Sequence, residues 1–233
     1  LTGYKNLLKL VTAAHLEGYY YKPRVDFEIL EKYREGLIVL SGCLNGDIPS
    51  LLLNNQTTQA EKILEKYLSL FEGNFYLELQ RHPEMEELDH VNSELIKLSR
   101  KYAVPLVATN DVHYLDPEDA YAQEILLCIQ TLHTIVEKNR PLSMIDKPDF
   151  YFKSVHEMKG SFIDLPEAID NSLKIAEQCN VEIPYGNWIL PRFDTPNKEP
   201  VDVYLTQLVY ERIKRVEKED KDIIKKRIEY ELN

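Results

Sequence analysis

Apolar residues recur with two different periods along the first hundred positions of the chain. Segments whose apolar residues lie three and four positions apart predict helices, because this spacing gathers them on one helix face. Between these segments lie short, nearly continuous apolar runs, which are typical of strands covered on both faces. The predicted helices cover 4–17, 26–33, 57–71 and 86–102, with Asp26 as the expected N-cap of the second. The predicted strands cover 37–40, 75–80 and 106–110.

Beyond the third strand the pattern becomes mainly helical. Asp116 and Pro117 begin a predicted helix that extends to Ile129, with the proline in the first turn, where it is tolerated. Two prolines make 131–149 look irregular, and four prolines mark 183–200 as a connector. The remaining segments are predicted as a short strand at 150–152, helices at 155–162 and 166–179, and charged helix from 201 onward.

The alternation of helix and strand predicts an α/β fold. Strands separated by helices run parallel and are joined by right-handed crossovers. A length of 233 residues corresponds to one domain and part of another. Because the chain starts at Leu1 rather than at methionine and stops at Asn233 within a helical pattern, we expect a segment of a longer polypeptide.

Composition narrows the possible functions. The chain has 28 Lys and Arg against 39 Asp and Glu, a net charge of −11, so its overall charge cannot provide a grip on duplex DNA. No apolar run approaches the roughly 18 residues of a membrane span, and no signal peptide is visible, so we expect a cytoplasmic protein without membrane contact. Three widely spaced cysteines argue against a disulfide framework, and the glycine-rich phosphate loops of mononucleotide-binding folds are absent.

Residues able to bind metal follow each predicted strand. Cys43 lies just past the first, His82 follows the second, and Asp111 and His113 follow the third. The carboxyl ends of parallel strands meet at one edge, so we expect the four side chains to cluster there. Imidazole and carboxylate suit zinc or manganese, and such an ion lowers the pKa of bound water toward ~7, which favours phosphoester hydrolysis.

Plainer interpretations stay open for the same residues. A histidine at a strand end is commonly a hydrogen-bonded surface residue, and a lone cysteine is commonly a small buried apolar one. A nucleophilic triad of Cys43, His82 and Asp111 can also be written. The run from Tyr19 to Arg24 mixes aromatic and basic residues that either stack on nucleic acid or simply pack. The other histidines are most simply solvated or capping residues: His15, His90, His133 and His156.

Several sequence blocks resemble the bacterial DNA polymerase III alpha subunit family. They occur in the family's order and spacing across essentially the whole chain, which is more specific than any single motif. The blocks are GYYYKPRVD at 18–26, GLIVLSGCL at 36–44, ATNDVHYL at 108–115, FYFKS at 150–154, PEAI at 166–169 and LPRF at 190–193.

The resemblance implies a domain organisation and a metal site. Residues 1–165 would form a polymerase and histidinol phosphatase (PHP) domain, an incomplete, distorted (β/α)7 barrel lacking its N-terminal strands. Residues 166–200 would be a connector, and 201–233 would begin the polymerase palm. In this family the positions of Asp111 and His113 are metal ligands and His82 stands where another is expected, whereas Cys43 occupies a position where related phosphoesterases place histidine. Zinc or manganese would serve 3′-5′ exonuclease activity.

The family also implies components outside these residues. A His-x-His strand would precede Leu1, and palm aspartates that bind magnesium for nucleotidyl transfer would follow Asn233. The whole protein would use template-primer DNA and deoxynucleoside triphosphates, and would bind a sliding clamp and a separate proofreading exonuclease subunit. Two alternatives remain: a stand-alone PHP-family phosphatase, and a non-catalytic docking module whose metal residues are relics.

Overall fold

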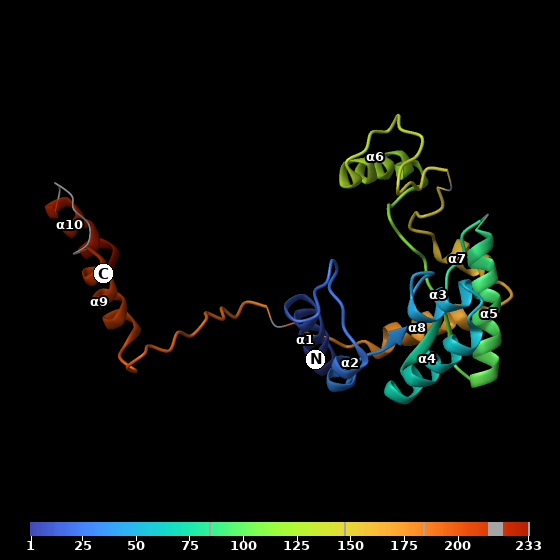
Figure 1. Ribbon diagram of the computed structural model, residues 1–233, viewed down its shortest axis with the longest axis horizontal. Coiled ribbons are helices and arrows are strands. Elements are labelled where there is room, and N and C mark those ends of the chain that lie inside the picture. Colours follow the sequence, from blue (N-terminus) through green and yellow to red (C-terminus); the bar gives the residue numbers. More distant parts are fainter. Residues whose placement is uncertain (84, 147, 184, 214–220, 233) are drawn as a thin grey trace. The chain divides into compact units, whose positions relative to one another are not determined.

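The computed structural model describes residues 1–83, 85–146, 148–183, 185–213 and 221–232, and most of its regular structure is helical (Figure 1). The chain divides into two units, Leu1–Glu182 and Ile183–Asn233. The first unit contains the sheet and all of the candidate metal residues.

A parallel sheet of three strands forms the centre of the first unit. The strands are β1 (Val39–Leu40), β2 (Phe75–Leu79) and β3 (Leu106–Ala108), paired in the order β1-β2-β3. Parallel neighbours joined through helices confirm the α/β class predicted from the alternating pattern. Closure into a seven-stranded barrel stays a prediction.

Two helices that precede β2 in the chain and one that follows it each bury an apolar face in the core beside the sheet. They are α3 (Asp47–Leu53), α4 (Thr57–Leu70) and α5 (Glu86–Tyr102), all three labelled in Figure 1. Leu77 and Leu79 of β2 are fully buried among them. The helices contribute buried residues that include Ile48, Leu52, Leu64, Val91, Leu95 and Leu98.

The edge of β3 is covered by α8 (Pro166–Gln178). Ala168, completely buried, allows the helix to approach closely, and Asn171 Nδ2 donates a 2.8 Å hydrogen bond to Leu106 O. A strand carbonyl that lacks a neighbouring strand is thereby satisfied. The structure thus places this helix with the sheet, although the predicted domain scheme counts it in the connector, and that scheme remains a prediction.

The remaining elements of the first unit are helical. At the amino end lie α1 (Thr2–Leu16) and α2 (Phe27–Tyr33), and Asp26 caps α2 by accepting from Ile29 N, as its sequence position predicts. Residues 115–149, between β3 and α7 (Val155–Ser161), form a lobe that begins with the 3₁₀ turn η1 (Pro117–Asp119) and α6 (Ala120–Thr131).

The second unit begins with extended chain and continues as helix. The described residues of 183–200 contain no helix or strand, as their four prolines predict, and their role as a connector stays a prediction. The two helices are α9 (Val201–Ile213) and α10 (Lys221–Leu232). The part of the predicted helical region at 214–220 lies outside the described residues.

Three local predictions need correction. The strand expected at 37–40 has only two paired residues, both half-buried, because β1 pairs with β2 alone among the described strands. The expected strand at 150–152 is a single bridge between Tyr151 and Tyr114. Helix α3 was not predicted, since its proline and short length conceal the periodicity, although a proline in the first turn is compatible with a helix.

Candidate metal centre

Cys43 lies in a tight loop directly after β1. Ser41 N donates to Tyr76 O, which extends the sheet ladder past the strand, and Gly46 N donates to Cys43 O at 2.8 Å. A Cβ atom at Gly46 would stand 2.2 Å from Ser41 O, so only glycine allows the chain to turn back here. The loop presents the Cys43 thiol to solvent, in contrast to the buried apolar role open to a lone cysteine.

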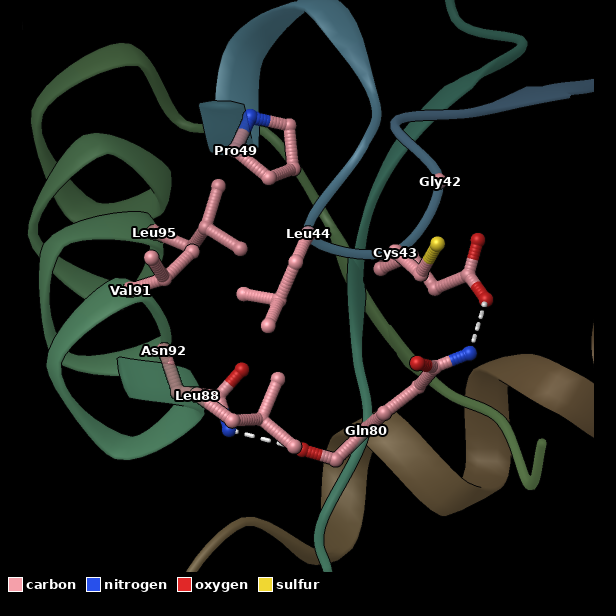
Figure 2. A pocket seen from close by; sticks show the side chains of 10 residues that line it. Gly42, Cys43, Leu44, Pro49, Gln80, Leu88, Val91, Asn92 and Leu95 are labelled. Atoms are coloured by element: carbon pink, nitrogen blue, oxygen red, sulfur yellow. Dashed lines mark hydrogen bonds between the residues drawn. The ribbon is translucent and has the colours of Figure 1, made fainter. Parts of the chain in front are cut away.

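The loop that carries Cys43 borders a small hollow beside α5 (Figure 2). Leu44 points toward Val91 and Leu95 of α5, whereas the sulfur of Cys43 lies on the opposite side of the loop. Asn92 Nδ2 donates to Gln80 O at 2.7 Å and ties α5 to the residue that follows β2. The apolar anchor Leu44 therefore fixes the loop while leaving Cys43 outside the core.

His82 is buried just past the end of β2. Its side chain is 4% exposed, and its Nδ1 lies 3.0 Å from Asp149 Oδ2. The other ring nitrogen, Nε2, is buried without a hydrogen-bond partner among the described residues. Buried polar atoms are nearly always paired, so this unpaired nitrogen needs an explanation.

Asp149 has a second partner in Lys153. Lys153 Nζ donates to Asp149 Oδ2 at 2.6 Å and to the Asp149 carbonyl oxygen at 3.0 Å. The lysine side chain is 7% exposed and the aspartate side chain 20% exposed. Since opposite charges at this depth compensate one another, the pair provides a fixed carboxylate next to His82.

Asp111 and His113 form a separate pair beyond the end of β3. Asp111 Oδ1 lies 3.3 Å from His113 Nε2, and both side chains are partly open to solvent. The two residues are separated by one position, which puts them on one side of an extended chain as the sequence predicts. Both can therefore face a common ligand.

Phe150 brings the two histidines to the same edge of the sheet. Its ring centroid lies 4.5 Å from that of His82 and 5.6 Å from that of His113. His113 N donates to Phe150 O at 2.8 Å, and Asn110 Nδ2 donates to Tyr151 O at 2.9 Å. These hydrogen bonds hold residues 149–151 alongside residues 110–113, which follow β3.

Polar side chains also meet across the strands at this edge. Thr109 Oγ1 donates to Glu78 Oε1 at 2.5 Å, and Gln80 Nε2 donates to the same oxygen at 3.3 Å. Residues two positions apart on a strand point to the same face, which allows Glu78 and Gln80 to meet here. They extend the polar edge from His82 toward Cys43.

The four candidate ligands do not form one cluster within the described residues. No group of three or more His, Cys, Asp and Glu side chains there is arranged to hold a metal ion. His82 pairs with Asp149, Asp111 pairs with His113, and Cys43 contacts neither pair. The unpaired nitrogen of His82 fits a metal ligand, but the donor set is incomplete, and the assignment of all four residues stays a prediction.

Sequence reasoning missed Asp149 and Lys153. Asp149 is 67 positions away from His82, in a segment predicted only as irregular, so no spacing rule connects the two. The one available signal is the FYFKS block at 150–154, which carries Phe150 and Lys153. Their importance becomes visible only when the segment is placed along the end of β3.

Comparisons with known proteins agree with the sequence resemblance. The PHP domain family matches residues 1–82. The DNA polymerase III subunit alpha of Borreliella burgdorferi is 45% identical over 99% of this chain, and that of Treponema pallidum is 42% identical over all of it. The Thermus aquaticus subunit is 41% identical over 90% of the chain. The chain is therefore similar, over nearly its whole length, to a part of the DNA polymerase III alpha subunits.

The chain matches only a part of each relative. The chain spans about a fifth of the length of the Borreliella and Treponema alpha subunits. Its helices in the described ranges include none that is long and apolar enough to cross a membrane.

Proposed function

We propose that this chain is part of a replicative DNA polymerase, whose complete protein extends template-primer DNA with deoxynucleoside triphosphates. The observation that carries the proposal is the 45% identity with a DNA polymerase III alpha subunit over 99% of the chain. Nucleotidyl transfer would use magnesium held by palm aspartates outside these residues. The protein would act in the cytoplasm with a sliding clamp and a proofreading exonuclease subunit.

Within that protein, the first unit would supply part of a metal-dependent phosphoesterase site. The supporting observations are the unpaired Nε2 of buried His82 and the neighbouring pair of Asp111 and His113, which share contacts with Phe150. These donors suit zinc or manganese. Cys43 would approach from the first strand end, and further histidines would come from residues preceding this chain. When bound, the metal would activate water for 3′-5′ exonuclease hydrolysis.

We expect Asp111→Asn or His113→Ala in the complete protein to remove bound metal and metal-dependent exonuclease activity. Polymerisation should be largely unchanged, because the palm ions are held elsewhere. Metal analysis of the purified variants, together with separate exonuclease and primer-extension assays, tests this expectation. Glu118→Gln, at an exposed position of η1, is a suitable control. Unchanged metal content in both variants would contradict the metal assignment.

A second candidate is a docking module for the proofreading exonuclease. It is favoured by the lack of a three-ligand group among the described residues. If the unit is a docking module, neither the unaltered polymerase subunit nor its Asp111→Asn variant would bind metal or hydrolyse DNA above background. A binding measurement between the complete polymerase subunit and the isolated exonuclease would then show the association without any metal requirement.

A further inference from the structure

The turn between α1 and α2 carries three consecutive tyrosines that do not enter the core. Tyr19, Tyr20 and Tyr21 are 61%, 65% and 81% exposed. Large aromatic side chains that gather on a surface commonly mark a binding site, because each ring offers a wide face for contact at a small loss of conformational freedom. Within the part of the chain that the structure describes, core packing therefore does not explain this aromatic run.

The backbone of the turn is tightly built. A Cβ atom at Gly18 would stand 2.1 Å from Arg24 O, so the two ends approach as closely as only glycine permits. Tyr20 N donates to Lys22 O at 3.2 Å across the turn. At the tip, Tyr21 has a φ of 58°, a left-handed conformation that is rare for a bulky residue. Such strained residues gather at ligand-binding sites, and the turn alone does not call for a tyrosine here.

Positive charge is concentrated in the same turn. Residues 18–25 include Lys22 and Arg24, both exposed, and no acidic residue, although the whole chain has a net charge of −11. The acidic neighbours Glu17 and Asp26 lie at the two ends of the turn. The turn is thus a small cationic site on an acidic chain.

Rings and cations lie close together in this turn. The Arg24 guanidinium stands 5.5 Å from the centre of the Tyr20 ring, and the rings of Tyr20 and Tyr21 meet edge to face at 4.6 Å between centroids. Aromatic rings stack on the unpaired bases of a single strand, while neighbouring cations contact its phosphates. The lack of acidic residues in the turn favours a polyanion over a protein surface of mixed charge.

We propose that residues 18–25 form a binding site for single-stranded nucleic acid, in which bases stack on the exposed tyrosines and phosphates contact Lys22 and Arg24. The site requires no base-specific hydrogen bond, so it accepts different sequences. It also uses none of the candidate metal ligands. The inference rests on this turn alone and stands whether or not the complete protein binds a metal.

Binding can be measured with the full 233-residue chain. Fluorescence anisotropy of a labelled oligothymidylate of about 12 nucleotides should show saturable binding. A duplex of the same length should bind more weakly, because its bases already stack on one another. A strand of equal charge that lacks bases should also bind more weakly. Absence of oligothymidylate binding, or equally tight binding of the strand without bases, would overturn the proposal.

Tyr21→Gly separates a binding role from a structural one. Glycine adopts the left-handed conformation without strain, so the melting temperature should not fall. Affinity for the oligothymidylate should fall about 5-fold or more, the lower end of what one stacked base contributes. Tyr230→Ala is the matched control, because Tyr230 is 75% exposed and also has an arginine, Arg227, 5.5 Å from its ring centre. Unchanged affinity in Tyr21→Gly, or an equal loss in Tyr230→Ala, would overturn the proposal.

The phosphate contacts predict a dependence on salt. For a single strand, the logarithm of the binding constant falls with the logarithm of the salt concentration by about 0.7 for each phosphate contacted. Contacts from Lys22 and Arg24 should therefore give a slope of about −1.4, and Lys22→Met should reduce it to about −0.7. A slope that Lys22→Met leaves unchanged would contradict the phosphate contact assigned to this lysine.

Photocrosslinking locates the contact in the complete protein. A strand that carries 5-iodouracil should, after irradiation, become attached within residues 19–21, as mapped by mass spectrometry of the peptides. Primer extension by the same preparation tests the proposed polymerase function separately. Crosslinks at the turn in a protein without polymerase activity would refute that function alone. An active polymerase whose crosslinks never include residues 19–21 would overturn this inference alone.

Discussion

Glu157 is the residue whose surroundings favour its charge most clearly. One carboxylate oxygen accepts from Ser154 N and Ser154 Oγ, which closes a capping box at the start of α7, and the other accepts from Tyr151 OH at 2.7 Å. The hydrogen bond from Ser154 is the main cause that lowers the pKa of Glu157 to about 2, followed by the bond from Tyr151. The same contact raises the pKa of Tyr151 to about 12.

This pKa predicts a pH-dependent stability difference. Because the pKa of Glu157 is lower in the folded than in the unfolded chain, its charge stabilises the fold above about pH 4.5, and this contribution is lost as the pH falls toward 2. We expect Glu157→Gln to lower the melting temperature at pH 7 and to have a much smaller effect near pH 2. Thermal unfolding followed by circular dichroism at several pH values measures this. A difference that stays constant with pH would show that the charge has no part in the cap.

At the residue scale, the sequence predicts local contacts and misses distant ones. Asp26 was predicted as an N-cap and accepts from Ile29 N, because capping depends only on neighbours three positions apart. His82 and His113 were predicted to share one edge of the sheet, and both contact Phe150. The bond between His82 and Asp149 could not be foreseen, since it depends on where an irregular segment is placed.

Among the elements, the lobe that contains α6 is organised around one buried carboxylate. Glu124 has no exposed surface and accepts from Arg140 Nε at 2.9 Å, from Ser143 Oγ at 2.7 Å and from Met144 N at 3.0 Å. Burial acts to raise the pKa of Glu124, but these hydrogen bonds together hold it below its usual value. The irregular chain after α6 is therefore folded over the helix by polar contacts rather than by an apolar core.

Removing this carboxylate should loosen the lobe. Glu124→Ala leaves the Arg140 guanidinium without its buried partner, and we expect a loss of about 3 kcal/mol in the stability of the lobe. Hydrogen exchange of the α6 amides, compared with urea unfolding of the whole chain, locates the effect. The exposed Glu118→Ala in the same lobe is the matched control. A double change of Glu124→Leu and Arg140→Met should cost less than Glu124→Ala alone, and a larger cost would contradict this account.

Elements with strong periodicity were predicted more accurately than those defined by tertiary pairing. Helix α5 was predicted at the residues where it is found, Glu86–Tyr102, because its apolar face repeats over several turns. Strand β1 is shorter than its apolar run, since strand length depends on the partner available at the sheet edge. The covering of β3 by α8 likewise depends on Asn171 reaching a carbonyl 65 positions away.

At the scale of the whole molecule, the free side of β1 is the feature with the largest expected effect. Among the described strands, β1 pairs only with β2, so its other side offers unpaired backbone groups. We expect the 233-residue chain alone to self-associate more readily, and to bind zinc or manganese more weakly, than a protein extended upstream. Size-exclusion chromatography and metal titration of both proteins measure this. A monomeric chain with equal metal affinity would show that neither fold nor site requires an upstream partner.

The bridge between Tyr114 and Tyr151 has a consequence for how the sequence can vary. It joins the two ends of the lobe, so that the chain between them leaves the sheet and returns to the same place. The entropy of closing such an excursion grows only with the logarithm of its length, about 0.6 kcal/mol for each doubling. We therefore expect insertions and deletions between Leu115 and Asp149 to be tolerated far better than changes of the same size within β2 or β3, provided that the contacts of Glu124 are kept.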